Sequence, residues 1–398
     1  MKRTLFITVQ KIIDQGGISA SIQNLLNEIH DEYDITFCSI EDYISPNANI
    51  PSNIRILRGS SFIGDAVLDS RLLLHQSFFR KLLRYGARIL RRCFGTKFII
   101  FCGLKQIRVP CEEFDAAIAF SGDLYRNGRI SRGGEYQLIS KYVKAKCKVA
   151  WVHNDIRKLG YNHEICINAF RGFDSIVSVS YDNKIILDEL FPEYKSKSYV
   201  VYNTYNIDRI TMMGNNSSNP YDENGKIHFV TVARLSIKQK RQDRIIKACG
   251  RLKKEGFLNF DWYLVGGGER GELEQMVKDN DVADIVFFTG QQTNPYPYMK
   301  YADAFVLTSL YEGYGMTNKE AQILGVPTLI TNYSAAKEVV DVGKQGDICE
   351  NSSEGVYQMI KHILQHTEDL KVYREYLKEH PITNELALQQ FCNVCGFN

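Results

Sequence analysis

Two carboxylates stand eight residues apart in the stretch SLYEGYGMTNKE, which ends at Glu320. The segment before it, YADAFVLTS, is apolar and predicts a buried parallel strand; the segment after it, EAQILGVPTLIT, predicts a short helix closed by Gly325 and a new strand that starts at Pro327. Glu312 is then expected on the loop at the carboxyl end of a strand, and Glu320 in the first turn of the following helix. Ligands bind at this edge of open α/β sheets.

The start of that helix supplies backbone donors. Amides around Gly315, Met316 and Thr317 are expected to point into the same space at the positive end of the helix, which suits a phosphate group. A structural alternative uses the same segment, because Thr317 and Glu320 have the spacing of a capping box. In that case Glu320 would only satisfy a backbone donor, and this segment alone leaves both interpretations open.

Basic residues follow another predicted strand in the stretch VTVARLSIKQKRQDRIIKA. Arg234 lies just beyond the strand and Lys240 at the start of the next helix, so both are expected at the carboxyl edge of the sheet. A nucleoside diphosphate leaving group gains negative charge as its bond breaks, and fixed cations that match this charge lower the barrier. The alternative is a solvated basic patch, because Lys238, Arg241 and Arg244 are close in sequence.

A glycine fingerprint, G-x-G-x-x-G, occurs at Gly266, Gly268 and Gly271, directly after the predicted strand DWYLV. A dinucleotide site also needs an acid about 20 residues further on, at the end of the next strand. Here the next strand, ADIVFFTG, ends at Thr289 and Gly290. An NAD-dependent oxidoreductase therefore stays as an alternative that the missing acid disfavours.

Two acids around Asn280 form the sequence D-x-D, a pattern with which many sugar transferases hold a divalent metal. Asp279 and Asp281 lie on a polar loop before the strand ADIVFFTG, which is the wrong edge of the sheet, and a turn explains them. We therefore expect no catalytic metal and no cofactor.

The amino-terminal half offers a glycine pair and a histidine. Gly16 and Gly17 follow the first predicted strand and precede a helix, where paired glycines let backbone amides approach a phosphate or sugar closely. A simple turn is the alternative. His153, in CKVAWVHND, falls at the carboxyl end of a strand and is expected to open on a cleft.

The composition is that of a globular protein with two domains: 398 residues, of which 44% are hydrophobic and 24% charged. Lysines and arginines number 49 against 46 acids, a formal charge of +3, so no global field recruits nucleic acid. No signal peptide is visible, and no apolar run approaches the roughly 18 residues of a membrane span. We expect a cytoplasmic protein.

One segment departs from this balance. Residues 71–108 contain ten lysines and arginines and no acid, with leucines and aromatics interleaved at near-helical spacing. We hypothesise that this surface touches the anionic inner face of the cell membrane as a peripheral contact. A core helix with a solvated basic face is the alternative.

Strands and helices alternate along most of the chain, which predicts an α/β protein with parallel sheets covered on both faces. A segment rich in Asn, Ser and Gly, MMGNNSSNPYDENGK, separates the halves. We expect two Rossmann-like domains that face each other across a cleft, over residues 1–204 and 227–378, joined by a linker at 205–226. Residues 379–398 are expected to form a helix that could return to the first domain.

Together these segments resemble the retaining glycosyltransferases of family 4, which have the GT-B fold. EGYGMTNKE is similar to the E-x7-E motif of that family, VARL with Lys240 to its phosphate motif, YLVGGGERGEL to its glycine turn, and FFTGQ to its base-binding strand end. Gly16, Gly17 and His153 match its amino-terminal loop and cleft histidine. The resemblance covers nearly the whole chain. The sequence around Glu320 is most similar to that of members that build bacterial capsules, exopolysaccharides or O-antigens.

This resemblance implies roles for the candidate residues. Glu312 would contact the donor sugar or the charge near its anomeric carbon, and Glu320 would bind the ribose. The diphosphate would be bound by Arg234, Lys240 and the amides of Gly315, Met316 and Thr317. Gly290 and Gln291 would lie near the nucleobase. His153, Gly16 and Gly17 would contact the donor sugar. The sequence departs from the family by one extra residue before Lys240, so Lys238 is a second candidate for the phosphate lysine.

The resemblance further implies a metal-independent, retaining hexosyltransferase that uses a nucleotide sugar, with UDP favoured over GDP. Its acceptor would be a glycan, which we expect to be lipid-linked, in the synthesis of bacterial surface polysaccharide. A non-catalytic GT-B subunit that scaffolds an assembly is a further alternative, against which both glutamates and Arg234 argue.

Overall fold

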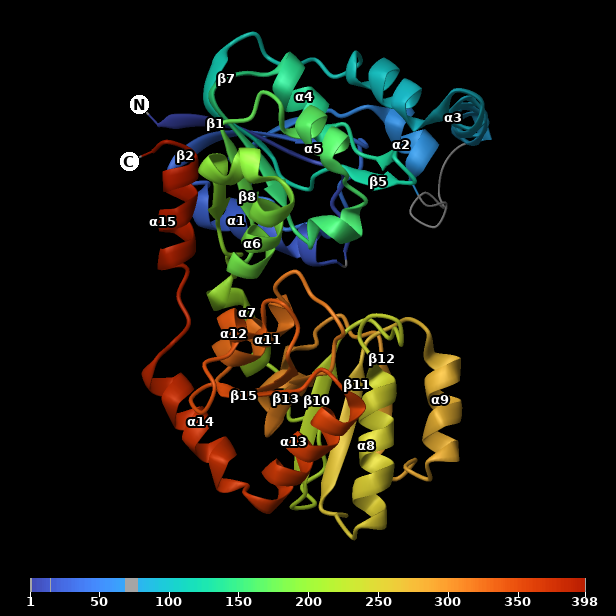
Figure 1. Ribbon diagram of the computed structural model, residues 1–398, viewed down its shortest axis with the longest axis vertical. Coiled ribbons are helices and arrows are strands. Elements are labelled where there is room, and N and C mark those ends of the chain that lie inside the picture. Colours follow the sequence, from blue (N-terminus) through green and yellow to red (C-terminus); the bar gives the residue numbers. More distant parts are fainter. Residues whose placement is uncertain (1, 15, 69–77, 398) are drawn as a thin grey trace. The chain divides into compact units, whose positions relative to one another are not determined.

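The computed structural model describes residues 2–14, 16–68 and 78–397 (Figure 1). The chain divides into two compact units, one formed by Met1–Tyr205 with Asn384–Asn398 and the other by Asn206–Thr383. Among the described residues, no helix is long and apolar enough to cross a lipid bilayer.

The first unit is built on a seven-stranded parallel sheet. Its strands, in spatial order, are β3 (Arg55–Leu57), β2 (Tyr33–Ser39), β1 (Arg3–Val9), β4 (Glu113–Ala119), β7 (Lys144–Val152), β8 (Ser175–Ser178) and β9 (Ser198–Val200). The order of the strands reverses between β1 and β4. A crevice suited to ligands arises at such a reversal, outside the carboxyl ends of the strands.

Helices and a small hairpin complete this unit. They are α1 (Gly17–Ile29), α2 (Ser61–Val67), α3 (Phe78–Leu104), α4 (Glu135–Tyr142), α5 (His163–Phe170), α6 (Tyr181–Leu190) and α15 (Glu385–Val394), the 3₁₀ helices η2 (Ile156–Leu159) and η3 (Pro192–Lys197), and the hairpin β5 (Leu124–Arg126) with β6 (Arg129–Arg132). Helix α15 packs on the sheet, since Ser175 Oγ donates to the Val394 carbonyl and the Gln390 side chain accepts from the Tyr202 amide.

The second unit has a six-stranded parallel sheet. Its strands, in spatial order, are β12 (Val286–Gly290), β11 (Phe260–Val265), β10 (Ile227–Val232), β13 (Ala304–Leu307), β14 (Thr328–Thr331) and β15 (Gly346–Cys349). Its helices are α7 (Ile207–Asn215), α8 (Gln242–Lys254), α9 (Arg270–Asp279), α10 (Tyr296–Lys300), α11 (Met316–Ile323), α12 (Ala336–Val339), α13 (Ser353–Gln365) and α14 (Glu368–Glu379).

The cores follow from the sequence. The strand FDWYLV buries Phe260 and Trp262 completely, and AFVL is buried along its whole length because helices cover both faces of the sheet. The predicted α/β class with two parallel sheets is confirmed. The segment expected as a linker, residues 205–226, differs from expectation: α7 lies within it and packs on α10 and α11. Asn206 caps this helix, because its side-chain oxygen accepts a hydrogen bond from the Arg209 amide.

Candidate active site

The two motifs of the second unit meet at the point where its strand order reverses, between β10 and β13. The loop after β10 and the loop after β13 are joined by several hydrogen bonds. The Thr308 hydroxyl donates to the carbonyl of Lys240 at 3.0 Å, and the Leu310 amide donates to the carbonyl of Gln239 at 2.8 Å. The basic segment and the glutamate segment, about 70 residues apart in sequence, therefore form one edge at the carboxyl ends of the strands.

An ion pair lies at the centre of this edge. Lys240 Nζ is 2.5 Å from Glu312 Oε1, and Ser309 Oγ donates to the same carboxylate oxygen at 2.6 Å. The Lys240 and Glu312 side chains are only 17% and 9% exposed, so solvent screens the pair weakly. Lys238 is exposed, and its side chain makes no hydrogen bond or ion pair with any residue that the structure describes. Of the two candidate lysines, Lys240 is the one directed at the glutamate motif.

Arg234 lies on the same loop as Lys240. It is exposed, and its guanidinium makes a long hydrogen bond of 3.4 Å to the side chain of Gln239. The backbone is better fixed, because the Arg234 carbonyl accepts from Gln242 at 3.0 Å. A guanidinium has five N–H donors, so most of its hydrogen-bonding capacity is left for an anion.

Glu320 occupies a different position from the one expected. Helix α11 starts at Met316, which puts Glu320 in the second turn of the helix rather than the first. The capping-box alternative is wrong, since Gly315 is the N-cap and no side chain caps this helix. Burial raises the pKa of Glu320 to about 7, and its carboxylate makes no hydrogen bond with the described residues. Tyr296 lies close enough for the charge of Glu320 to raise the pKa of its phenol, after burial as the larger cause.

Glu320 is partly buried, and a carboxylate in such a position without a hydrogen-bond partner is costly in its charged form. Such groups concentrate at functional sites, where a ligand supplies the missing partners. Glu320 fits a hydrogen-bonding role toward a ligand better than a structural role. Nothing in the sequence signalled Tyr296, which the packing of α10 against α11 brings to this carboxylate.

The turn before α11 requires glycine. Gly315 has φ of 77°, and a Cβ there would lie 2.6 Å from Asn318 Nδ2 and 2.7 Å from the Tyr333 hydroxyl. The tight turn leaves the amides of Met316 and Thr317 at the positive end of the helix without a capping side chain. These amides can therefore serve a phosphate group.

The glycine fingerprint has a packing explanation. A Cβ on Gly266 would lie 2.0 Å from the carbonyl oxygen of Ala233, and one on Gly268 would lie 2.4 Å from that of Leu235. Gly266 and Gly268 are required because the turn crosses the loop after β10 at close range, whereas a Cβ on Gly271 would meet no atom within 4 Å. Gln291 lies beside this turn, where its side-chain oxygen accepts from the Gly267 amide at 3.0 Å.

Two further candidates of the second unit are Gly290 and the D-x-D pattern. Gly290 ends β12, and its carbonyl accepts from the Gly266 amide at 2.9 Å. The D-x-D pattern lies where α9 ends and before β12 begins, at the amino edge of the sheet, and Asp281 is 3.3 Å from Lys253 Nζ.

In the first unit, the glycine pair lies at the start of α1. Gly16 is the N-cap with φ of 136°, which favours glycine, while a Cβ on Gly17 would meet no atom within 4 Å. Packing therefore does not require glycine at position 17. The space above the first turn of α1 is open to a ligand, and no side chain caps this helix.

His153 directly follows β7 and is 8% exposed. Its ring packs on Phe120 with centroids 4.6 Å apart, and its Nε2 has no hydrogen-bond partner among the described residues. Burial lowers the pKa of His153 to about 4, against the opposing effect of a hydrogen bond to the Phe120 backbone. The lowered pKa favours the neutral imidazole, whose Nε2 is buried without a partner among the described residues.

Two buried acids of the first unit were not expected from the sequence. Burial raises the pKa of Asp123 to about 7, and it raises the pKa of Glu135 well above its usual range. Glu135 accepts from the Ser121 amide at 2.9 Å through one oxygen, while the other has no partner among the described residues. Glu135 begins α4, so in sequence it is indistinguishable from an ordinary acid at a helix start.

These fold features define a class of protein: α/β units with parallel sheets of seven and six strands, the architecture of GT-B glycosyltransferases. The structure resembles that of HepE from Anabaena, solved in complex with UDP and glucose, with a TM-score of 0.64 at 14% identity over 99% of this chain and 97% of that one. Residues 215–380 match the family Glycosyl transferases group 1. The resemblance drawn from the motifs is thereby confirmed.

Two curated relatives match parts of the chain. An uncharacterized glycosyltransferase of Methanocaldococcus jannaschii is 29% identical over 195 residues, 46% of this chain and 48% of the relative. The O-antigen biosynthesis glycosyltransferase WbnH of Escherichia coli is 30% identical over 116 residues, 29% of this chain and 32% of the relative. The chain thus spans about half or less of the length of these relatives.

Proposed function

We propose that this protein is a retaining glycosyltransferase that moves a hexose from a nucleotide sugar, with UDP as the nucleotide, to a glycan in surface polysaccharide synthesis. The observation that carries the proposal is the Lys240–Glu312 pair with Ser309 at the strand reversal of the second unit. The family of residues 215–380 supports it, as do the relative named for O-antigen synthesis and the neighbour solved with UDP and glucose.

In this proposal the second unit holds the donor. Arg234, Lys240 and the first amides of α11 bind the diphosphate, and Glu320 binds the ribose hydroxyls. Lys240 can turn from Glu312 to the phosphate, which frees the Glu312 carboxylate for the sugar hydroxyls or for the charge that grows near the anomeric carbon. The cations then stabilise the departing diphosphate more than the bound donor, which is the condition for catalysis.

Retention follows if the acceptor attacks from the face that the nucleotide leaves. The departing phosphate then takes the acceptor's proton, and no covalent intermediate on the protein is needed. His153, as a neutral imidazole, and the amides at Gly16 and Gly17 contact the donor sugar. We propose that no metal takes part, because Arg234 and Lys240 supply the positive charge.

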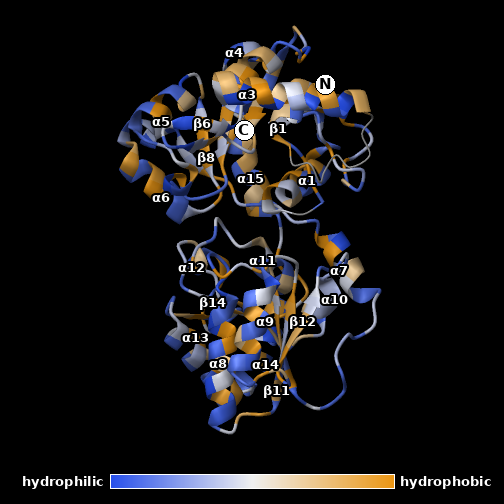
Figure 2. Ribbon diagram, turned by 90° about the vertical axis from the view of Figure 1, so that its right-hand side faces the viewer, coloured by the Kyte–Doolittle hydropathy of each residue, from blue (hydrophilic) through white to orange (hydrophobic). Residues whose placement is uncertain are grey.

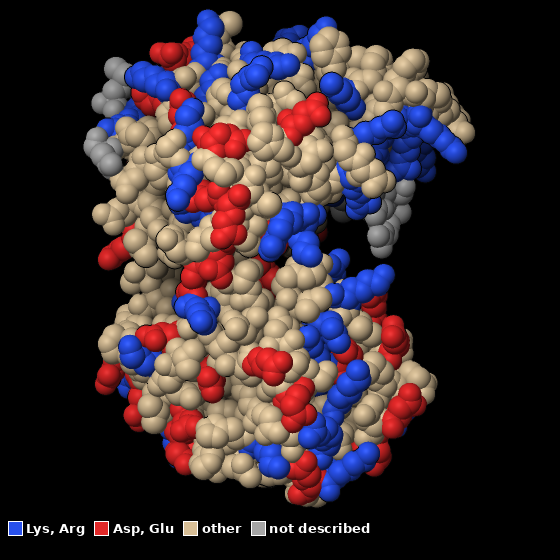
Figure 3. Space-filling model, viewed as in Figure 1, with Lys and Arg blue, Asp and Glu red and all other residues tan. Residues whose placement is uncertain are grey.

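The acceptor is proposed to be lipid-linked, with helix α3 of the first unit at the membrane surface. Residues 71–77 of the basic segment lie outside the described residues. Figure 2 shows many hydrophobic residues on α3, and ten large apolar side chains there are exposed: Phe78, Phe79, Leu82, Leu83, Tyr85, Ile89, Leu90, Phe94, Phe98 and Phe101. Figure 3 shows a group of lysines and arginines in the region where Figure 1 places α3. An exposed apolar face with basic flanks suits an anionic bilayer.

Liposome flotation tests the membrane contact. The protein is expected to float with vesicles that contain anionic lipid and to stay in solution with purely zwitterionic vesicles. Equal partition with both kinds of vesicle would refute an electrostatic contact.

The donor assignment is tested by calorimetry with a panel of nucleotides and nucleotide sugars in the presence of EDTA. UDP and a UDP-hexose are expected to bind. Glu320→Ala is expected to weaken nucleotide affinity, whereas Glu312→Ala chiefly slows turnover. Unchanged binding and rate in both variants would refute the assignment.

A further inference from the structure

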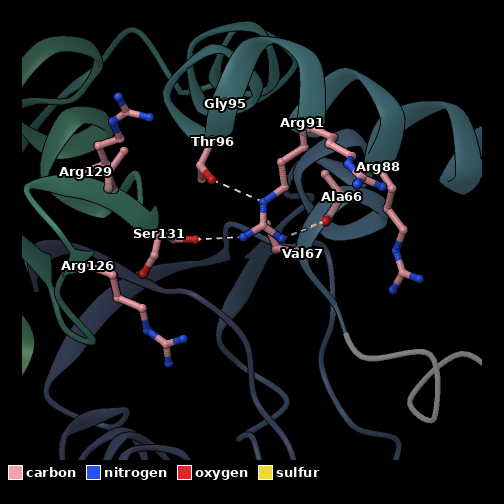
Figure 4. Close-up of a pocket in the computed structure, with 11 residues that line it drawn as sticks. Ala66, Val67, Arg88, Arg91, Gly95, Thr96, Arg126, Arg129 and Ser131 are labelled. Atoms are coloured by element: carbon pink, nitrogen blue, oxygen red, sulfur yellow. Dashed lines mark hydrogen bonds between the residues drawn. The ribbon is translucent and has the colours of Figure 1, made fainter.

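A concave site lies in the first unit. It is a pocket of about 500 Å³ between α3, the end of α2 and the β5–β6 hairpin (Figure 4). Eleven residues line it; none is acidic, and five are arginines: Arg88, Arg91, Arg92, Arg126 and Arg129. Five guanidinium groups around one space repel each other unless an anion enters.

Arg91 forms the fixed part of this pocket. Its guanidinium donates to Thr96 Oγ1, to the Ala66 carbonyl and to the Ser131 carbonyl, each at 3.1 Å (Figure 4). These three acceptors hold the group in one orientation and link α2, α3 and the hairpin. All three are neutral, so they leave its positive charge uncompensated. A guanidinium held in this way is preorganised for an anion.

The hairpin supplies two further charges from its tip. Asn127 and Gly128 form the turn with φ of 49° and 72°, and the register pairs Arg126 directly with Arg129. Like charges opposite each other destabilise a hairpin, so this pairing has no stabilising role of its own. Within the described part of the chain, the side chains of Arg92, Arg126 and Arg129 make no hydrogen bond or ion pair.

Acids in the neighbourhood are engaged elsewhere or do not line the pocket. Glu41 is buried and pairs with Arg132, the residue that ends β6. Asp65 of α2 lies close enough to Arg84 and Arg88 for their charges to act on its carboxylate, and burial is the larger influence and raises its pKa. Neither acid reaches Arg92, Arg126 or Arg129 with an ion pair.

A kink in α3 joins this pocket to the apolar face of the helix. Gly95 leaves the helical conformation with φ of 80° and ψ of 168°, and it lines the pocket. Phe94 and Phe98 flank the kink with ring centroids 5.0 Å apart, and they are 62% and 38% exposed. Phe94 precedes Gly95 and Phe98 lies two residues beyond Thr96, both of which line the pocket, so exposed aromatic surface continues from the pocket along α3. This arrangement suits a phosphate group attached to an apolar chain.

From this geometry we propose that the pocket binds the phosphate or diphosphate group of the lipid-linked acceptor, so that the arginines fix the headgroup while the chain lies along α3. Arginine forks match phosphate oxygens in a bidentate manner, which a lysine cannot do. The identification of the ligand as an acceptor substrate rests on the proposed function. The prediction that the pocket binds a diphosphate attached to an isoprenoid chain does not depend on that function.

The test is calorimetry of the full chain with farnesyl diphosphate, farnesol and inorganic diphosphate, in saturating UDP so that the donor site is occupied. Farnesyl diphosphate is expected to bind, farnesol not to bind, and inorganic diphosphate to bind at least about tenfold more weakly. A variant with Arg92→Gln, Arg126→Gln and Arg129→Gln should lose at least about tenfold in affinity for farnesyl diphosphate, or about 1.4 kcal/mol.

A matched control removes the same number of charges from the helix and its end, outside the pocket: Lys81→Gln, Lys97→Gln and Lys105→Gln. This control should change the affinity less than about twofold. Equal losses in both triple variants, or no binding of farnesyl diphosphate to the unsubstituted protein, would overturn the proposal. Equally tight binding of inorganic diphosphate would overturn the lipid as the source of the anion.

The experiment separates this inference from the proposed function. Failure of UDP to bind would count against the glycosyltransferase proposal alone, because farnesyl diphosphate binding and its loss in the arginine variant can be measured without it. Normal UDP binding in the arginine variant would also show that the second unit is folded.

Discussion

Replacement of Glu320 by glutamine should make the protein more stable at alkaline pH while it weakens the binding of UDP. Burial raises the pKa of Glu320 from its ordinary value of 4.5 to about 7. At about 1.36 kcal/mol per pKa unit, this shift corresponds to about 3 kcal/mol. The value is an upper bound, because the residue keeps some contact with solvent.

The sign follows from proton linkage. Between about pH 4.5 and 7 the unfolded chain has lost the proton of Glu320 while the folded chain retains it, so stability falls as the pH rises through this window. Glutamine is neutral at every pH. The variant should therefore match the unsubstituted protein near pH 4.5 and exceed it by up to about 3 kcal/mol at pH 8.

Urea unfolding followed by tryptophan fluorescence measures this difference. Each unit contains one of the two tryptophans, so Trp151→Phe in both proteins leaves Trp262 as the reporter of the second unit. Glu375→Gln, on the exposed face of α14, is the matched control and should change stability little at either pH. A gap that is absent at pH 8, or equal at both pH values, would refute the buried-charge argument. Stabilisation with unchanged UDP affinity would refute the binding role.

Three further predictions concern the same sites. Lys240→Met should weaken UDP affinity by about tenfold or more in calorimetry, because a charge-assisted contact is lost. The affinity of the Lys238→Met variant should stay within about twofold of that of the unsubstituted protein. The reverse order of effects would show that Lys238 is the phosphate lysine. Glu312→Ala should lower kcat by about 100-fold or more in a UDP-release assay, with UDP affinity within about threefold, and an unchanged kcat would exclude a role at the reacting centre. Because the pKa of His153 lies near 4, its ring NMR signals, assigned with His153→Gln, should not titrate between about pH 5.5 and 8; a midpoint inside that range would contradict a neutral imidazole.

The sequence predicted the class of fold and the position of the site for a physical reason. Parallel strands end at one edge of their sheet, so residues that directly follow a buried strand, such as Arg234 and Glu312, can be assigned to that edge from the alternation alone. The same logic identified His153 after β7. These assignments need only strand boundaries and no knowledge of the loops.

Loop geometry could not be predicted in this way. The choice between Lys238 and Lys240 depends on a hydrogen bond from Thr308, about 70 residues away, that fixes the path of the loop. Glu320 lies in the second turn rather than the first because Gly315, with its positive φ, begins the helix two residues earlier than the Thr317 capping pattern indicated.

Long-range packing accounts for the other features that the sequence did not signal. The sequence gives no indication that Glu135 is buried, because acids are common at helix starts. The arginine pocket depends on a two-stranded hairpin that places Arg126 and Arg129 beside α3. The basic segment was evident in the sequence, but the contribution of the hairpin was not.

A crystal structure of the full chain with UDP, grown with EDTA, would test the central claim most directly. We predict that the diphosphate lies within hydrogen-bond distance of Arg234 and Lys240, that Lys240 has left Glu312, and that the Glu320 carboxylate contacts the ribose hydroxyls. UDP bound elsewhere, with the Lys240–Glu312 pair intact and Glu320 without a ligand contact, would contradict this account.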